Sequence, residues 1–413
     1  MRLPAGAASP QSLERLAPPT DIFRMRAHPS LTSAYSGPAP PRAQATMGRN
    51  EPCWCGQGVK WKKCHAGREH QPPFNVFDVE DDARKRGRKG YCSQSFIGDG
   101  CTDKIVRSHT VQRNGGLTAI AEGKSRVLSV KTNLRAMIDH NGNPPPVEIG
   151  IGNASVFPGF CATHDDAIFK PIEGKNVGLT ANEAMLFAYR AVAYERFTKA
   201  IQVANAPIQR QMDRGQPLHI QEAIQVRCHL TEAGARRGLT EVEVLLANCR
   251  ERIETGQTSG FHYRAYRFDA TLPLVGCGGY MPEIAIDGTR LQHLARGTAA
   301  LEQLTLTITS YAGMSVAMFA WIGPENGPSG TYLDAFDKVV DADKPDALVQ
   351  IAFEQMENIF LRKSWWEGLP TAQRADLTRR IRSGVGLSVR APGYYKRSVP
   401  LLAKATLVEQ AKA

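Results

Sequence analysis

Three cysteines and one histidine stand close together near the start of the chain. The four residues are Cys53, Cys55, Cys64 and His65. The segment around them is rich in glycine and lysine and holds too few apolar side chains to bury a core, so its folding free energy must come from another source. Thiolate and imidazole donors suit Zn²⁺ in a closed structural site, whereas disulfides suit secreted chains, of which this sequence shows no sign. We therefore expect these residues to bind one zinc ion.

Length and composition indicate a chain with more than one core. The 413 residues are enough for two or three domains. No run approaches the ~18 apolar residues that a membrane span requires. The best candidate, 311–323, contains Ser315 and is typical of a buried strand. The first residues lack the apolar core of a signal peptide, so we expect a cytoplasmic protein with no membrane partner.

The charge of the chain is strongly positive. A formal net charge of +11 keeps nucleic acid and ribosomal surfaces in view as partners. Basic residues concentrate in 84–89, and Lys60, Lys62, Lys63 and Arg68 lie just before that run. Two interpretations remain open. The run is either a solvated linker or a strip that contacts phosphates.

Composition and apolar pattern divide the chain into six segments. We expect a disordered Pro/Ala-rich segment at 1–46, a zinc motif at 47–67, a basic linker at 68–90, a second zinc module at 91–175, a helical region at 176–256 and an α+β domain at 257–413. Met47 directly precedes the zinc motif, so we expect translation to begin there. The fold class predicted for the whole chain is α+β.

Apolar periodicity predicts the main elements. Residues at three- and four-residue steps from Met185 predict a buried helix, and Pro207 should help to break the helical region into at least two helices. Strict alternation over 304–309 predicts a strand with one buried face and one polar face. A further apolar stripe from Leu348 to Ile359 predicts helix.

The first motif resembles a known metal-binding family. The run from Gly48 to Cys55 (GRNEPCWC), continued by Lys62 to His65 (KKCH), closely resembles the SEC-C motif, known from the C-terminus of the bacterial protein-translocation motor. The resemblance implies a zinc-bound docking module, and a zinc ion closed by four protein ligands has no open position for substrate. Trp54 and Trp61 either lie exposed for contact with protein or RNA, or pack inside the zinc fold.

Four further candidate ligands follow at wider spacing. They are Cys92, Cys101, Cys161 and His164. The Cys-x-x-His pair opens a helix predicted at 162–170, which places both donors on one side of a metal. The set resembles a treble-clef zinc module, which implies a second zinc ion. Because the gap between Cys92 and Cys101 exceeds that of a usual knuckle, His109 is a possible substitute for Cys92; buried thiols are the alternative to a metal.

The same region resembles two groups of proteins. A group of bacterial proteins without an established activity shares its pattern over most of 91–200. The shared residues are Ser108-His109, Gln112, Asn114-Gly115, Gly159 to Asp165, Phe169 and Glu173. More distantly, the arrangement resembles an HNH endonuclease, which implies His109 as general base and Asp165 as a ligand of Mg²⁺ or Mn²⁺. Two positions depart from that family: Asp165 stands where a histidine is commoner, and Asn153 is offset from the expected asparagine.

These observations favour two zinc ions and a role in recognition. The leading hypothesis is a zinc-binding adaptor that recognises nucleic acid, the ribosome or a nucleic-acid-associated protein. The alternative is an HNH-like endonuclease that acts in defence against foreign DNA, with His109 as its base.

Overall fold

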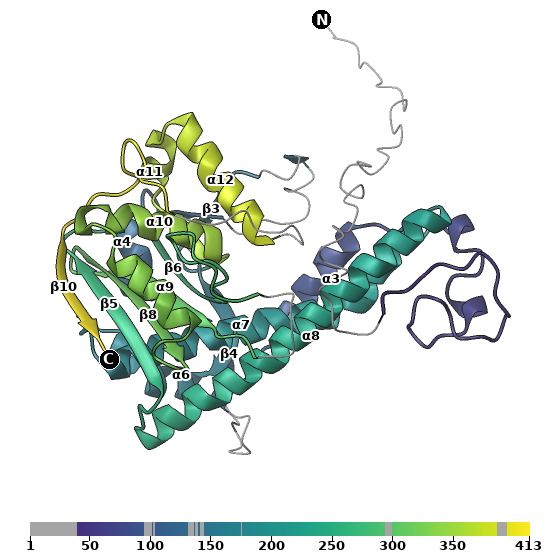
Figure 1. Ribbon diagram of the computed structural model, residues 1–413, viewed down its shortest axis with the longest axis horizontal. Helices are drawn as coiled ribbons and strands as arrows, with labels where there is room; N and C mark the ends of the chain where they lie inside the picture. The colour runs from purple at the N-terminus through teal and green to yellow at the C-terminus, as the bar shows by residue number, and fades with distance from the viewer. Residues whose placement is uncertain are drawn as a thin grey trace, which may run out of the picture.

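An antiparallel sheet of eight strands forms the centre of the structure, a computed structural model (Figure 1). The structure describes residues 39–94, 101, 104–130, 136, 139–140, 144–174, 176–293, 300–385 and 395–413. Across the sheet the strands are β10 (Leu407–Lys412), β5 (Phe261–Phe268), β8 (Met314–Ile322), β7 (Leu304–Tyr311), β6 (Leu274–Tyr280), β9 (Ile359–Leu361), β2 (Arg126–Ser129) and β3 (Val147–Gly150). With helices beside this sheet, the structure agrees with the predicted α+β class.

Helices cover both faces of the sheet. Alternate residues of β8 point to opposite faces. Val316, Met318 and Ala320 join the core formed with α7 (Ala181–Gln209). The intervening residues of β8 join the core on the other face, formed with α9 (Pro328–Asp337) and α10 (Lys344–Gln355). The helices α11 (Lys363–Gly368) and α12 (Thr371–Val385) and the short η7 (Asp341–Asp343) complete this side.

Strand β7 is buried along its whole length, so the polar face expected for 304–309 lies inside the protein rather than at the surface. The threonines of this face are buried because α7 and the π-helix η4 (Arg113–Leu117) cover it. Their hydroxyls have partners: Thr305 donates to the carbonyl of Ala320 at 2.9 Å, and Thr309 to Oε1 of Gln112 at 3.0 Å. Burial of a hydroxyl costs little free energy when the hydroxyl has a hydrogen-bond partner, so alternating threonines are tolerated in this core.

A long helical hairpin projects from the sheet (Figure 1). Its arms are α7 and α8 (Leu218–Thr255), joined by the short helix η6 (Arg210–Asp213). Thr180 and Glu183 form a capping box at the start of α7. Pro207 lies inside α7 near its last turn, so the expected break falls a few residues later, at η6 and Gly215.

The N-terminal part lies beside the far end of the hairpin and then returns along it (Figure 1). It contains η1 (Trp61–Lys63), η2 (Arg68–His70) and α3 (Phe77–Gly87), so the expected linker at 68–90 carries a helix. A separate two-stranded sheet follows, β1 (Ile105–His109) with β4 (Val156–Cys161), and β4 leads into α6 (Ala162–Phe169) and η5 (Lys170–Ile172). Between β1 and β4 lie the π-helix η4 (Arg113–Leu117) and α4 (Thr118–Ile120).

Some expectations from the sequence differ from the structure, and others are not tested by it. The apolar stripe from Leu348 is helical only to Gln355, and Ile359 begins strand β9. Most of the Pro/Ala-rich segment, residues 1–38, lies outside the described residues. The six-segment division stays a prediction, and β2 and β3, from inside 91–175, pair within the large sheet. Among the helices that the structure describes, none is long and apolar enough to cross a membrane.

One buried asparagine connects the large sheet to the β1–β4 pair. Asn358 donates from Nδ2 to Oγ1 of Thr110 at 2.6 Å and to the carbonyl of Cys277 at 3.2 Å. We predict that Asn358→Ala lowers the free energy of unfolding by about 1–3 kcal/mol, because it leaves buried acceptors without a donor. Urea denaturation followed by circular dichroism measures the change. Asn248→Ala, within α8, serves as the control and should change it by no more than ~0.5 kcal/mol.

Candidate metal centres

The first candidate centre, here called the first cluster, consists of Cys53, Cys55, Cys64 and His65. One donor atom from each residue lies within 4.8 Å of the others. Nδ1 of His65 lies 3.1 Å from Sγ of Cys53 and 3.2 Å from Sγ of Cys64, so Nδ1 is the ring nitrogen that faces the sulfurs. Three thiols and one imidazole in this arrangement are compatible with a tetrahedral zinc site.

Local turns bring these four residues together. Gly56 and Gly58 adopt positive φ angles of 77° and 70°, which reverse the chain directly after Cys55. The amide of Cys53 then donates to the carbonyl of Val59 at 2.8 Å. Trp54 is 7% exposed, and its ring centroid lies 4.3 Å from that of His65. The structure therefore confirms the second interpretation of Trp54, which is packing inside the fold.

Proton equilibria in the first cluster favour a cation. Burial raises the pKa of Cys53, and the hydrogen bond with Cys55 raises that of Cys64. The hydrogen bond from Cys64 lowers the pKa of Cys55 to about 4. The three sulfurs therefore shift one another's pKa values, as expected of thiols held in contact. A metal ion in place of the thiol protons removes the repulsion between thiolates, since thiolates are the form that binds metal.

The outer side of the first cluster is a buried ionic network. Nε2 of His65 lies 2.8 Å from Oδ2 of Asp213, and Nε of Arg68 donates to Oδ1 of Asp213 at 2.5 Å. Asp213 has no exposed surface. Burial raises the pKa of the Asp213 carboxyl, but the hydrogen bonds from His65 and Arg68 outweigh it and hold the pKa below its usual range.

The second candidate centre, here called the second cluster, consists of Cys92, Cys101, Cys161 and His164. Its donor atoms also lie within 4.8 Å of one another. Nδ1 of His164 lies 3.3 Å from Sγ of Cys92 and 3.2 Å from Sγ of Cys161. Cys92 belongs to this group and His109 does not, so the arrangement favours Cys92 as the ligand over the substitute His109.

Two local features assemble the second cluster. Cys161 is the N-cap of α6, and its sulfur accepts the backbone N–H of His164, so the helix start itself aims both side chains at one point. The segment before Cys92 is tied to β4, because the amide of Tyr91 donates to the carbonyl of Pro158 at 3.1 Å and the hydroxyl of Ser93 donates to that of Gly159 at 2.8 Å. Residues distant in sequence therefore meet at the end of β4.

Several buried polar atoms beside β1 and α6 have no hydrogen-bond partner in the part of the chain that the structure describes. They include Oγ of Ser108, Nε2 of His109, Oδ1 of Asp165, and Nε and Nη1 of Arg190. Most buried polar atoms in native proteins have a partner, so such a group marks a site rather than packing alone. Burial lowers the pKa of His109, which leaves the imidazole neutral at neutral pH. Burial raises the pKa of Asp165, against the effect of the Ser108 hydroxyl.

Arg190 was not singled out as a site residue from the sequence. It is 1% exposed, its guanidinium lies 4.1 Å from the centroid of the Phe169 ring, and Nη2 donates to Glu173 at 2.6 Å. Its neighbour Tyr189 belongs to the apolar stripe of α7, which indicated burial for this part of the helix. No sequence pattern pointed to Asp213, because its partner His65 lies 148 residues earlier in the chain.

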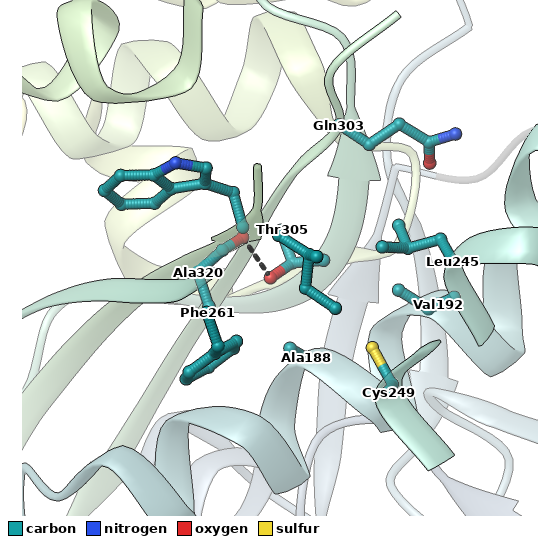
Figure 2. A pocket seen from close by; sticks show the side chains of 10 residues that line it. Ala188, Val192, Leu245, Cys249, Phe261, Gln303, Thr305 and Ala320 are labelled. Atoms are coloured by element: carbon teal, nitrogen blue, oxygen red, sulfur yellow. Dashed lines mark hydrogen bonds between the residues drawn. The ribbon is translucent and has the colours of Figure 1, made fainter. Parts of the chain in front are cut away.

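A cavity between α7, α8 and the sheet does not offer a substrate site. Figure 2 shows its mostly apolar lining, with Cys249 on one wall and the hydrogen bond from Thr305 to Ala320 on another. Its volume is about 10 Å³, the space that one water molecule occupies. All nine cysteines lie in the described part of the chain, and none forms a disulfide.

Comparison with known proteins supports the first cluster. The family model of the SEC-C motif matches residues 49–67, which include all four residues of the first cluster. No curated protein and no solved structure matches the chain. Both clusters are compatible with a bound metal, and the match gives the first the character of a metal-binding motif.

We predict two zinc ions per chain, one for each cluster. Cys161→Ser should reduce the content to one, because serine supplies no thiolate and the remaining donors no longer close the second site. Mass spectrometry of metals in the purified protein measures this. Cys249→Ser, which changes an equally buried thiol outside both clusters, should keep both ions. One zinc ion or none in the unaltered chain would contradict the second site.

Proposed function

We propose that the chain is a zinc-scaffolded adaptor that binds nucleic acid through the surface of its SEC-C segment. The observation that carries the proposal is the contrast between the inside and the outside of this segment. Inside, the first cluster is closed by four protein donors, which leaves no coordination position for a substrate. Outside, Lys60, Lys62 and Lys63 are exposed, with no ion-pair partner among the described residues.

The charge on neighbouring α3 is less available than the sequence suggests. Arg84 pairs with Asp81 at 2.7 Å, and Arg86 pairs with Asp82 at 2.5 Å. The acidic first half of this helix therefore compensates much of its basic second half. The three lysines of the SEC-C segment are the better candidates for phosphate contacts, since they do not have to break an ion pair before they bind.

We predict that the triple variant Lys60→Gln, Lys62→Gln, Lys63→Gln weakens binding to DNA or RNA oligonucleotides. If all three lysines contact phosphates, the slope of log K against log salt should fall in magnitude by about 2–3. Fluorescence anisotropy at several salt concentrations measures both quantities. Arg84→Gln, Arg86→Gln removes charges that are already paired and should change the slope less. An unchanged slope in the triple variant, or no binding at low salt, would count against the proposal.

A second candidate function is supported by the polar atoms beside β1 and α6. His109 is the last residue of β1, β4 runs antiparallel to it, and Asp165 lies in the first turn of α6. A strand that ends in histidine and a Cys-x-x-His pair that opens a helix are the features by which the sequence resembles the HNH endonucleases. Nε2 of His109 and Oδ1 of Asp165 are buried and have no hydrogen-bond partner among the described residues, as expected of groups that act on a ligand.

In this candidate function the residues have distinct roles in phosphodiester hydrolysis. Neutral His109 accepts a proton from the attacking water. Asp165 would hold a Mg²⁺ or Mn²⁺ ion, and that ion would supply charge stabilisation at the phosphate. The buried cation of Arg190 adds positive potential next to the same place. Asn153, the residue offset from the family pattern, lies at the surface and accepts a hydrogen bond from Arg107 at 2.9 Å.

We predict for this candidate that the protein cleaves plasmid DNA or RNA in Mg²⁺ or Mn²⁺, and that His109→Ala reduces the rate at least ~100-fold through loss of the base. Agarose gels of a time course measure the rate. His219→Ala, an exposed histidine on α8, is the matched control and should retain it. Cleavage that persists in His109→Ala indicates a contaminating nuclease. Intact substrate with every metal leaves the adaptor as the function.

A further inference from the structure

The connection between α7 and α8 meets the first cluster through one buried carboxylate. Oδ2 of Asp213 lies 2.8 Å from Nε2 of His65 and accepts a second hydrogen bond, from Nε2 of Gln225, at 2.6 Å. Its other oxygen accepts from Arg68. Asp213 thus joins a residue of the first cluster to both η6 and α8, and it does so with no contact to solvent.

The network around this carboxylate continues in both directions. Arg68 also donates to the carbonyl of Arg210 at 3.2 Å, and its own carbonyl accepts from the amide of Gly215 at 3.0 Å. On the far side, Arg210 donates to Gln225 at 2.9 Å. Leu218, the first residue of α8, packs against the small core of the SEC-C segment. Polar and apolar contacts together fix this segment on the tip of the hairpin.

We propose that Asp213 is the outer-sphere anchor of the first metal site and makes metal binding and attachment to the α7–α8 hairpin a single event. A histidine ligand usually donates its second ring N–H to a carboxylate, which fixes the ring and its tautomer. Here the carboxylate comes from a helix far outside the matched motif, so the SEC-C segment is a metal-dependent cap on the hairpin rather than a tethered module. This attachment also fixes the orientation of the surface that carries Lys60, Lys62 and Lys63 relative to the hairpin.

The metal-free state follows from the same contacts. Without a metal, the ring of His65 is held by its hydrogen bond with Asp213 and by packing against the ring of Trp54, and no metal–ligand bonds join it to the three sulfurs. The segment has a small core of its own, centred on Trp54, so metal loss removes most of its folding free energy. Asp213 then lies buried beside Arg68 and Gln225 without its histidine partner. Removal of the metal should therefore loosen η6 as well as the segment.

The first test measures zinc affinity in the full chain. The background is Cys161→Ser, so that only the first site titrates. Asp213→Asn keeps the shape but removes the charge, and it should weaken Zn²⁺ binding 10–100-fold in competition with a chromogenic chelator. Glu241→Gln is the matched control, because Glu241 pairs with Arg237 at 2.9 Å farther along α8, outside the network around Asp213. Affinity of the Asp213→Asn protein within twofold of its parent overturns the proposal.

A second measurement covers the case in which Asp213→Asn fails to fold. Hydrogen exchange of the unaltered chain is compared before and after Zn²⁺ removal by a chelator. Amides of 210–216 should exchange at least tenfold faster without the metal, whereas those of β7 should not change. Equal exchange of 210–216 in both states overturns the proposal. The proposal rests on zinc in the first cluster, so the metal content of the native chain is measured first. A chain without metal contradicts the zinc site itself. A chain with zinc but no change in exchange contradicts only the coupling between the zinc site and the hairpin.

Discussion

The packing of α7 is the interaction on which both metal clusters depend. Its first half lies against the sheet and β4, where residues such as Tyr189 and Val192 are fully or almost fully buried. Its last turn leads into η6 and hence to Asp213. A helix of this length spans roughly 44 Å, so one continuous element connects the neighbourhood of the second cluster to the first. Because apolar burial fixes one end, the other end and the SEC-C segment on it have a defined position.

Patterns that are local in sequence predicted the structure well. The four residues of the first cluster fall within one short segment, and the Cys-x-x-His pair is set by the start of a single helix, so sequence spacing pointed to groups of donors that the structure also brings together. The alternation over 304–309 predicted a strand correctly but not its environment, because burial of the threonine face depends on α7 and Gln112, which come from other parts of the chain. The prediction of helix at Ile359 was wrong for a related reason. Pairing of that residue with Gly276 in the sheet overrides its helical spacing.

Residues that act through long-range contacts could not be found in this way. Asp213 looks like any acidic residue at the end of a helix until His65 and Arg68 are placed beside it. Arg190 follows an apolar stripe and carries no motif, and its importance comes from burial next to His109 and Asp165. The ionic network around Asp213 and the group of atoms around Arg190 are built from several elements each. Only the tertiary fold brings those elements together.

The carboxylate beside the first cluster and the polar group near the second cluster differ in how far their atoms have hydrogen-bond partners. Around the first cluster, both oxygens of Asp213 have partners and Arg68 uses several of its donors, as expected where a metal site serves the structure. Near the second cluster, Nε2 of His109, Oδ1 of Asp165, and Nε and Nη1 of Arg190 have no partner among the described residues, at a cost of about 1–3 kcal/mol each. A ligand that supplied hydrogen-bond partners to these atoms would recover that cost, which is the physical argument for a binding site beside β1 and α6.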